Sequence, residues 1–406
     1  MNDTVVIVGG GIAGVSTAAA LRAKGFDGDV TLVDAGEFPY DRPPLSKDFL
    51  AGDKSLQQIA LQPPSWYDDQ RVRLVNRATV TALRPTEGKL ELADGTLLPA
   101  DRVVLATGAS AARPPIPGIH SPRVHVLRAA EDADRLRAAL QPGARLLVVG
   151  AGLIGAEAAS TAVRLGCDVT LVDPAAVPLS AVLGNELAQW THGLHARHGI
   201  TTVQTVVQSL TDRGPAGIEV QLADQSPART YDAVLVGVGM VPHTDLAQQA
   251  GITVDRGVVV DASQVTSNPA VLAVGDPART RDAGGLLLPR AEHWEAAQHD
   301  GARAAATILG TPAPAATASW FWTDRHGRHI EGVGHMASAE LTVVRGWFED
   351  PSFAVFGLRD GLVVAAAAVD DSGAVRAARR LIDRRIAVEP GRLADASVNL
   401  RALLRG

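Results

Sequence analysis

The sequence predicts an α/β protein with two open parallel β-sheets and a C-terminal α+β domain. Three observations lead to this prediction. A strand–turn–helix–strand segment occurs twice, and the chain of 406 residues is too long for a single ordinary domain. An apolar content of 46% with many Ala and Gly residues is typical of a well-buried α/β protein rather than a disordered chain.

The repeated segment consists of a buried strand, a glycine-rich turn, an Ala-rich helix and a second strand that ends in an acidic residue. The matching residues are Val5–Val8, Gly9, Gly11, Gly14 and Asp34 in the first copy, and Leu146–Val149, Gly150, Gly152, Gly155 and Asp173 in the second. This spacing is the fingerprint of a Rossmann-like βαβ unit that binds a dinucleotide.

The residue types in this fingerprint have separate physical tasks. The first glycine makes the tight turn, the second lets main-chain N–H groups approach a pyrophosphate, and the third lets the helix pack on the strand. The helix N-terminus adds partial positive charge. The acid at the end of the second strand, Asp34 or Asp173, then accepts a hydrogen bond from a ribose 2′-hydroxyl.

Each copy is followed by a further strand that returns to its sheet. Asp101–Gly108 follows the first copy and Asp232–Gly239 the second, and both end in small residues. The carboxyl ends of such strands are where open α/β sheets bind ligands. The proline-rich stretch Arg113–Gly118 is a natural linker between the two halves.

Charge and cysteine content exclude several classes of protein. The chain has 38 Lys and Arg residues against 44 Asp and Glu residues, without the basic excess that nucleic-acid binding needs. Cys167 is the only cysteine, so neither an internal disulfide nor a Cys-x-x-Cys site can form, and we expect no metal site. The longest apolar run, Leu362–Val369, is too short to span a membrane, and the N-terminus lacks a signal-peptide pattern. We therefore expect a cytoplasmic protein with no nucleic-acid or membrane partner.

Three further strings carry a resemblance to a known family. They are Pro39–Lys47 (PYDRPPLSK), Val271–Asp276 (VLAVGD) and Arg290–Trp294 (RAEHW). Together with the two glycine motifs, they make the chain similar along essentially its whole length to flavoprotein reductases with two dinucleotide sites in a glutathione-reductase-like arrangement. Within that group it resembles the NADH-dependent ferredoxin reductases that serve oxygenases.

The resemblance implies that the first copy binds FAD and the second binds NADH. It places Arg42 and Lys47 beside the flavin, Asp276 at the ribityl chain, and Arg290–Trp294 under the isoalloxazine ring. For the two cofactors together, it implies contacts by Gly9, Gly11, Ala13, Gly14, Asp34, Arg42, Lys47, Val80, Ala106, Thr107, Gly108, Arg128, Gly150, Gly152, Leu153, Ile154, Gly155, Glu157, Asp173, Gly237, Gly239, Gly275, Asp276, Glu292, His293, Trp294 and Trp322. The implied domains are an FAD-binding domain in two pieces (1–112 and 241–315), an NADH-binding domain (113–240) and a C-terminal α+β domain (316–406).

The residues after the second acid favour NADH over NADPH. A 2′-phosphate needs an Arg or Lys at this place, whereas Asp173 is followed by Pro174–Val177 without a cation. The family more often has Glu here with an Arg a few residues later, so this sequence departs from the usual cofactor clamp at these positions.

Two residues are predicted to support the chemistry without acting as nucleophiles. Glu157 follows the second glycine motif, and two interpretations stay open: an acid that complements the helix dipole in the first turn, or a partner of Lys47 near the flavin. The resemblance favours the pairing, so Lys47 and Glu157 are the predicted catalytic residues, in the sense that they position groups. Lys47 would offset negative charge on the reduced flavin.

A route through a thiol is not expected. Reductases of disulfides, peroxide or persulfides in this group need a thiolate close to the flavin. Cys167 lies just before the acidic strand of the second copy, where it is expected to be a small residue near the sheet edge. Electrons should therefore leave the flavin for an external one-electron carrier.

The C-terminal region resembles the third domain of the family. Ser319–Asp324 is similar to a signature in which a Trp lies between flavin and ferredoxin, although Trp320 and Trp322 are also suited to a core, sharing one face of a strand. Phe353–Val369 is predicted to form a β-hairpin. A run of arginines on a predicted helix is either part of a face for an acidic ferredoxin or a solvated helix face. These are Arg376, Arg379, Arg380, Arg384 and Arg385.

The combined prediction is an NADH:ferredoxin reductase that passes single electrons to a [2Fe-2S] ferredoxin feeding an oxygenase. Two alternatives stay open: a rubredoxin reductase, and an NADH-sensing flavoprotein module resembling apoptosis-inducing factor. The sequence departs from the family at Arg325–His326, where Gln and an aromatic residue are usual, and at His243, where Asn is common. The first departure is near the predicted partner face and is compatible with a different iron–sulfur partner.

Overall fold

The computed structural model describes residues 3–405, which group into two compact units. Unit 1 contains the chain up to Arg42 together with Ser55–Ser110 and Met240–Ala316. Unit 2 contains Pro43–Lys54, Ala111–Gly239 and the chain from Thr317 onward. The segment Pro43–Lys54, placed in the first domain by the sequence analysis, therefore packs with unit 2. The predicted division into three domains stays a prediction.

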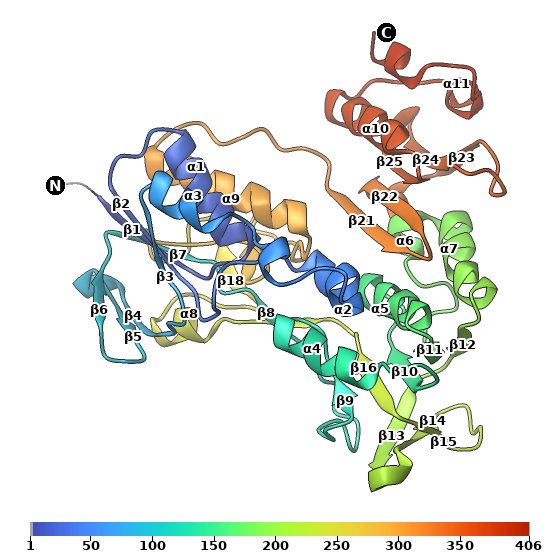
Figure 1. Cartoon of the computed structure of the whole chain (residues 1–406). Helices are drawn as coiled ribbons and strands as arrows, with labels where there is room; N and C mark the ends of the chain where they lie inside the picture. The colour runs from blue at the N-terminus through green and yellow to red at the C-terminus, as the bar shows by residue number, and fades with distance from the viewer. Residues whose placement is uncertain (1–2, 406) are drawn as a thin grey trace. The chain divides into compact units, whose positions relative to one another are not determined.

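Unit 1 is built on a five-stranded parallel sheet with the order β19-β7-β1-β2-β3 (Figure 1). Its strands are β1 (Thr4–Val8), β2 (Asp29–Val33), β3 (Val72–Val75), β7 (Arg102–Leu105) and β19 (Val271–Ala273). Its helices are α1 (Ile12–Ala23), α3 (Pro64–Asp69), α8 (Asp245–Gln249) and α9 (Trp294–Leu309). Helix α1 packs on α9, and Gly301 permits this close approach because a Cβ there would lie 2.7 Å from the Ala13 carbonyl oxygen.

Unit 2 contains a second parallel sheet, with the order β12-β11-β10-β16-β9. The strands are β9 (Val124–His125), β10 (Arg145–Val149), β11 (Asp168–Asp173), β12 (Thr201–Gln204) and β16 (Ala233–Val236). The accompanying helices are α2 (Asp48–Ala51), α4 (Ala130–Ala139), α5 (Leu153–Arg164), α6 (Ser180–Leu183) and α7 (Asn185–Arg197). The central strands β10 and β16 are almost continuously apolar, as expected of parallel strands covered on both faces, whereas the outer strand β12 (TTVQ) is largely polar.

The two sheets repeat one topology, which confirms the prediction of two Rossmann-like units. In both, the strand before the glycine turn is central and has the acid-bearing strand on one side and the returning strand on the other. Each copy also contains a three-stranded antiparallel sheet before its returning strand. These are β4 (Val80–Arg84), β5 (Lys89–Leu92) and β6 (Leu97–Pro99), and β13 (Val207–Asp212), β14 (Ile218–Leu222) and β15 (Arg229–Tyr231).

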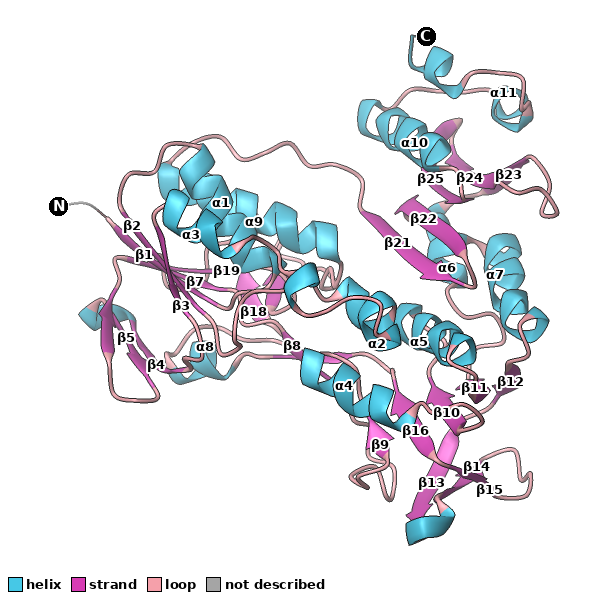
Figure 2. Cartoon of the chain, viewed as in Figure 1, coloured by secondary structure: helices cyan, strands magenta, loops and turns pink. Residues whose placement is uncertain are grey.

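The C-terminal part of unit 2 is a five-stranded antiparallel sheet with the order β21-β22-β25-β24-β23 (Figure 2). Its elements are β21 (Trp320–Arg325), β22 (Arg328–Gly334), β23 (Leu341–Arg345), β24 (Phe353–Arg359), β25 (Leu362–Val369), α10 (Ser372–Arg384) and α11 (Pro390–Ala394). The predicted hairpin is confirmed as β24 and β25, and α10 packs against β25. Alternate residues of the sheet join two apolar clusters, one under α10 and one that includes residues of α6 and α7.

Two short ribbons complete the structure: β8 (Ala109–Ala111) pairs with β17 (Met240–Pro242), and β18 (Val258–Val260) pairs with β20 (Ala278–Thr280). Across residues 3–405, none of the helices combines the length and the apolar character that a membrane span needs.

Candidate functional site

The glycine turn of unit 1, Gly9–Gly14, accepts only glycine at two of its positions. Gly9 has φ +115°, and a Cβ on it would lie 2.2 Å from the Ala106 carbonyl oxygen at the end of β7. A Cβ on Gly14 would lie 2.0 Å from the Gly9 carbonyl oxygen. The loop therefore turns tightly between β1 and α1, and the helix begins close to the strand end.

The glycine turn of unit 2 has the same geometry. Gly150 has φ +100°, and its Cβ would lie 2.4 Å from the Gly237 carbonyl oxygen, while a Cβ on Gly155 would lie 1.9 Å from the Gly150 carbonyl oxygen. Helices α1 and α5 both begin after a glycine N-cap, Gly11 or Gly152, that has no side chain to bond the first N–H groups. Two uncapped helix starts beside tight glycine turns fit the pyrophosphates of two dinucleotides.

The two predicted acids hold equivalent places at these turns. Asp34 accepts hydrogen bonds from the main-chain N–H groups of Gly10 at 2.5 Å and Gly36 at 2.6 Å. Asp173 accepts from Ala151 and Ala175, both at 2.8 Å. Each carboxylate is thus fixed by the loop next to it and by the turn that follows its own strand. Their contact with a ribose stays a prediction.

The two turns differ in what faces the middle glycine. An Arg42 Nη1 atom lies 2.7 Å from the place that a Cβ on Gly11 would take, whereas no atom lies within 4 Å of that place at Gly152. Ile154, just after Gly152, is 40% exposed, and Val238 at the end of β16 is 43% exposed. The second turn is therefore open and bordered by apolar side chains, which fits a ligand that enters and leaves.

The string Val271–Asp276, predicted to reach the ribityl chain of FAD, is held by an acid that was not predicted from the sequence. Gly275 follows β19 with φ +72° and donates its N–H to Asp300 Oδ2 at 3.2 Å. The other Asp300 oxygen accepts from Gln264 Nε2 at 3.2 Å. Burial raises the pKa of Asp300 to about 6, although the Gly275 N–H opposes this shift. The only sequence signal is an acid in the middle of the Ala-rich helix α9.

The structure distributes the predicted cofactor residues over both units. Those in unit 1 are Gly9, Gly11, Ala13, Gly14, Asp34, Arg42, Val80, Ala106, Thr107, Gly108, Gly275, Asp276, Glu292, His293 and Trp294. Those in unit 2 are Lys47, Arg128, Gly150, Gly152, Leu153, Ile154, Gly155, Glu157, Asp173, Gly237, Gly239 and Trp322. Lys47, predicted to lie beside the flavin, therefore belongs to a different unit from the other residues predicted to lie at the flavin.

Several unit 1 residues of this set are held by neighbours. Trp294 at the start of α9 donates its indole N–H to Asp41 at 2.8 Å. The side chain of Val80 is buried in the core, so its predicted cofactor contact would have to come from the main chain. His243, the second departure from the family, lies with Nδ1 2.9 Å from the Thr107 carbonyl oxygen and Nε2 2.5 Å from Ser110 Oγ. It braces the turn at the end of β7.

The predicted pair Lys47 and Glu157 comes together in unit 2. Lys47 Nζ lies 3.6 Å from Glu157 Oε1 and donates to Asp324 Oδ2 at 2.8 Å. Glu157 is buried and also accepts from Ser46 Oγ at 2.5 Å and Thr323 Oγ1 at 2.7 Å. It is the fifth residue of α5, beyond the first turn expected from the sequence, because the helix starts at Leu153. A buried carboxylate needs such partners, and here it has them.

Arg325 is buried, contrary to the expectation that it lies near a partner face. The alternation of β21 turns Phe321, Thr323 and Arg325 inward, and Arg325 is only 3% exposed. Burial lowers the pKa of Arg325 to about 10, an effect that the negative charge of Glu157 opposes. Arg325 therefore balances the charge of Glu157 inside the protein and cannot contact a carrier directly.

His326, the other half of that departure, joins a group of histidines against α7. It stacks on His198 with ring centroids 4.3 Å apart, and its Nε2 lies 3.0 Å from His195 Nδ1. Burial lowers the pKa of His195 to about 2 and that of His326 to about 4, and nearby positive charge lowers both further. These two rings are therefore neutral packing groups near pH 7. Within the described chain, no group of three or more His, Cys, Asp or Glu residues has metal-binding geometry.

Cys167 has the structural role expected of it. It is 8% exposed, its Sγ lies 3.6 Å from the Gln141 carbonyl oxygen, and burial raises the pKa of the thiol. A protonated, buried thiol is a poor nucleophile.

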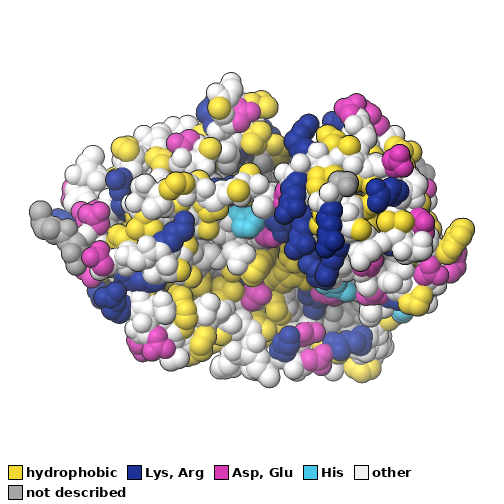
Figure 3. Space-filling model, turned by 90° about the horizontal axis from the view of Figure 1, so that it is seen from above, with side chains coloured by type: hydrophobic (Ala, Val, Ile, Leu, Met, Phe, Trp, Pro, Cys, Tyr) yellow, Lys and Arg dark blue, Asp and Glu magenta, His cyan; other side chains and the backbone are white. Residues whose placement is uncertain are grey.

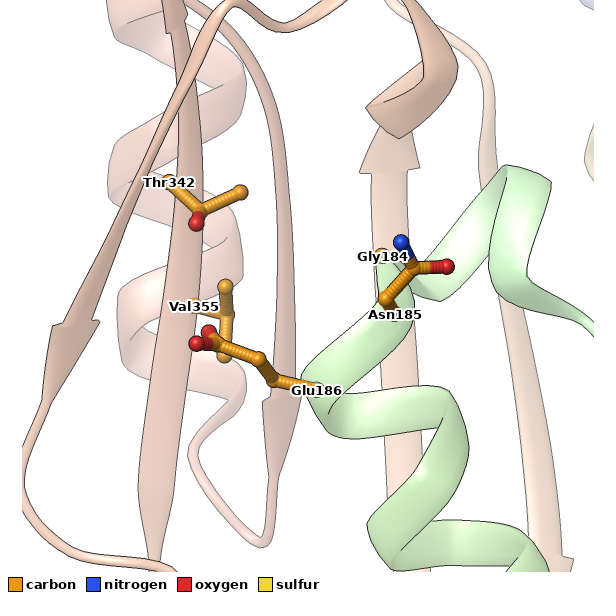
Figure 4. Close-up of a pocket in the computed structure, with 5 residues that line it drawn as sticks. All are labelled: Gly184, Asn185, Glu186, Thr342 and Val355. Atoms are coloured by element: carbon orange, nitrogen blue, oxygen red, sulfur yellow. The ribbon is translucent and has the colours of Figure 1, made fainter. Parts of the chain in front are cut away.

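A hollow of about 220 Å³ lies elsewhere in unit 2, between the start of α7 and strands β23 and β24 (Figure 4). It is lined by Gly184, Asn185, Glu186, Thr342 and Val355. None of these is a predicted site residue, and Glu186 is the single charged side chain among them.

Comparisons with known proteins cover the whole described chain. Residues 3–301 match the family model described as pyridine nucleotide-disulphide oxidoreductase, and residues 320–404 match the model described as reductase C-terminal.

The chain is 38% identical to the ferredoxin–NAD(+) reductase component of the anthranilate 1,2-dioxygenase system of Burkholderia cepacia, with 99% of each chain covered. It is 35% identical to the corresponding component of the biphenyl dioxygenase system of Paraburkholderia xenovorans, covering all of this chain and 99% of the relative. Among solved structures, the covalent putidaredoxin reductase–putidaredoxin complex matches with a TM-score of 0.92 and 33% identity, covering all of this chain and 98% of that one.

Proposed function

Because the chain belongs to the pyridine nucleotide-disulphide oxidoreductase family, we propose that it is an NADH-dependent ferredoxin reductase of an oxygenase system. The observation that carries this proposal is the similarity to ferredoxin reductase components over the full chain, including the C-terminal domain. The single, buried cysteine supports it, because reduction of disulfides in this family needs a cysteine pair.

As a flavoprotein oxidoreductase of this family, the protein uses FAD and NAD(H). Bound FAD supplies the chemistry that connects a two-electron hydride donor to a one-electron acceptor. The protein's own task is to bind, orient and electrostatically support the two cofactors.

The two glycine turns divide this task. We assign the FAD pyrophosphate to the turn at Gly9–Gly14 and that of NADH to the turn at Gly150–Gly155. The Arg42 guanidinium at the first turn supports a resident cofactor, and the open second turn supports one that exchanges. Asp173, held by two main-chain N–H groups and followed by apolar residues, would repel a 2′-phosphate, which supports a preference for NADH.

Lys47 is assigned the electrostatic role at the flavin. Its ammonium group is held by Glu157 and Asp324, so its position is defined before any cofactor reacts. A positive charge fixed in this way stabilises negative charge that develops near it without reorganisation. Glu157 acts through Lys47 and is therefore a positioning residue.

The proposed acceptor is a [2Fe-2S] ferredoxin that feeds an oxygenase. Helix α10 presents Arg376, Arg380 and Arg384 to solvent, while Arg379 donates to Thr317 Oγ1 at 2.7 Å. Figure 3 shows Lys and Arg side chains gathered in one area of the face that it displays. Exposed guanidinium groups on one helix favour an acidic partner and would raise the rate of encounter at low ionic strength.

The test is anaerobic stopped-flow reduction of the purified protein by NADH and, separately, by NADPH, followed by addition of a [2Fe-2S] ferredoxin. We expect fast bleaching of the flavin with NADH, slow bleaching with NADPH, and single-electron reduction of the ferredoxin. Reduction of rubredoxin but not of ferredoxin would identify the rubredoxin reductase alternative. Slow bleaching with a persistent charge-transfer band would favour the NADH-sensing alternative. A cytoplasmic location stays a prediction.

A further inference from the structure

One face of the β21–β22 strand pair carries a closed ring of side chains. Alternation puts Trp320, Trp322 and Asp324 on the same face of β21, and the antiparallel register places Glu331 opposite Trp322 and His329 opposite Asp324. Lys47, which directly precedes helix α2, completes the ring. Its members, in order, are Lys47, Asp324, His329, Glu331, Trp320 and Trp322.

The charged half of the ring is a chain of short contacts. Lys47 Nζ donates to Asp324 Oδ2 at 2.8 Å, and the other oxygen of Asp324 lies 2.6 Å from His329 Nδ1. The second ring nitrogen of His329, Nε2, lies 3.0 Å from Glu331 Oε1. His329 therefore connects two carboxylates, and it can donate to both only when it is protonated, because a neutral imidazole has a single N–H.

The aromatic half closes the ring. Glu331 Oε2 accepts the indole N–H of Trp320 at 2.8 Å, and Trp320 stacks on Trp322 with centroids 5.0 Å apart and planes 22° apart. Lys47 Nζ lies 5.4 Å from the centroid of the Trp322 ring. Ser372, at the start of α10, also donates to Glu331. Lys47, predicted to lie beside the flavin, and the two tryptophans of the signature in which a Trp is predicted to lie between flavin and ferredoxin are thus parts of one structure.

The charges around His329 favour its protonated form. Asp324 faces it from β21 and Glu331 from its own strand, while Asp370, before α10, accepts its main-chain N–H and pairs with Arg328. Burial lowers the pKa of His329, but its bonds to the two carboxylates outweigh this and raise the pKa above its usual value. Burial likewise raises the pKa of Asp324, but hydrogen bonds from Lys47 and His329 bring it below its usual value.

We propose that His329 is a positioning residue for electron transfer, whose imidazolium holds Asp324 and Glu331 together and so fixes Lys47 and the stacked tryptophans at the same time. With His329 protonated, the four ionisable members of the ring sum to zero charge. When the proton is lost, the ring carries one net negative charge and one of the two His329 contacts has no donor. The proposal deepens the proposed function and rests on it.

This role gives electron transfer to the carrier its own pH dependence. The rate should be highest with His329 protonated and should fall as the pH rises through the pKa of His329 in the folded protein. The same proton contributes stability that is complete below the usual histidine pKa and is lost above the raised one. The reduction of the flavin by NADH is measured in parallel, because that step involves Lys47 but not the passage of electrons to the carrier.

The test uses flavin-loaded protein with His329→Gln, which can still hydrogen-bond but cannot carry the proton. The matched control is His120→Gln, since His120 is an exposed histidine of the same unit. Ferredoxin reduction and NADH bleaching are measured between about pH 6 and pH 9, a window that spans the usual histidine pKa and values above it. We expect His329→Gln to lower ferredoxin reduction about fivefold at low pH and to remove its pH dependence. The control should behave as wild type.

A second measurement does not depend on turnover. NMR of protein with ¹³C-labelled histidine should show the His329 resonance titrating above its usual range, and Glu331→Gln should lower that pKa without removing either tryptophan. An unchanged pKa in Glu331→Gln, or a His329→Gln variant with the wild-type pH profile, would overturn the proposal. If NADH fails to bleach the wild-type flavin, the proposed function is wrong, whereas normal bleaching with an unaltered His329→Gln variant rejects only the role of His329.

Discussion

The two βαβ units share one backbone design but differ in what surrounds it. Both have a left-handed first glycine against a returning strand, an uncapped helix start, and an aspartate held by two main-chain N–H groups. The first turn has a guanidinium beside its middle glycine, and the second is open. The repeated elements support the proposal that both turns bind a dinucleotide, and their surroundings support the proposal that the first retains its cofactor while the second exchanges it.

The second unit also carries groups that have no counterpart in the first. Helix α5 bears the buried Glu157, and the C-terminal sheet brings Thr323 and Arg325 against it. The corresponding helix of the first unit, α1, packs on α9 through Gly301 instead. Duplication therefore supports the proposed binding of two cofactors, whereas the added sheet supplies part of the charged environment of Lys47.

The largest effect is expected from alanine at Gly9, the first glycine of the first turn. The comparison is with alanine at Gly152, the second glycine of the second turn. Gly9→Ala puts a Cβ 2.2 Å from a carbonyl oxygen at a residue with φ +115°, so we expect a loss of roughly 3 kcal/mol or more in the free energy of unfolding and loss of FAD. Gly152→Ala meets no atom within 4 Å, so the protein should fold normally with FAD bound. Only the KM for NADH should rise, because the methyl group enters the space of the pyrophosphate.

Flavin absorbance per protein, thermal unfolding and the KM for NADH measure these two outcomes. Equal loss of FAD in both variants would break the comparison, because the two turns would then serve the same cofactor or fold as one unit.

The next effect concerns the two aspartates. Asp173→Asn keeps one acceptor for the loop but removes the charge that disfavours a 2′-phosphate, so kcat/KM for NADH should fall about tenfold to hundredfold and that for NADPH much less. Asp34→Asn is the matched control from the first copy. It should lower the FAD content, yet the molecules that keep FAD should retain the wild-type ratio of NADH to NADPH activity. A changed ratio in Asp34→Asn would contradict the assignment of the turns.

The repeat and the fold were predictable from sequence because they depend on local patterns: apolar strands, glycines at fixed spacing, and acids at strand ends. The pairing of Lys47 with Glu157 was reached only through the resemblance, since 110 residues separate them. Asp300 and the ring at His329 were not predicted, because they arise from helix packing and from cross-strand register, which no local pattern encodes. The burial of Arg325 follows from strand alternation once the start of β21 is known.

A smaller effect is expected from Asp300, which accepts the N–H of Gly275 just after strand β19 of unit 1. Its pKa of about 6 in the folded protein lies above the usual value of 3.8, so the folded state binds this proton more tightly than the unfolded state. Its contribution to stability should therefore fall as the pH rises from about 4 to about 6 and stay constant above that range.

Asp300→Asn removes this titration while keeping an oxygen to accept from Gly275. Between pH 4.5 and 7.5, the difference in unfolding free energy between wild type and Asp300→Asn should change by about 2 kcal/mol, to the disadvantage of wild type at the higher pH. Denaturant unfolding at both pH values measures it, with Asp69→Asn on α3 as an exposed control. A pH-independent difference would mean that Asp300 is ionised throughout and that its bond to Gly275 is purely structural.

The smallest effect is expected at Cys167, where the two copies differ at a matched position. Cys167 directly precedes Asp168 of β11, as Gly28 directly precedes Asp29 of β2, and the first copy needs no thiol there. Cys167→Ala should lower the unfolding free energy by less than about 1 kcal/mol, because the thiol is small and its contact with Gln141 is weak. NADH bleaching and ferredoxin reduction should be unchanged, both in this variant and in wild-type protein treated with an alkylating agent. A tenfold loss of ferredoxin reduction in Cys167→Ala, with NADH bleaching intact, would instead place a thiol on the electron path. The second βαβ unit would then differ from the first in its chemistry, and not only in its openness and its charged neighbours.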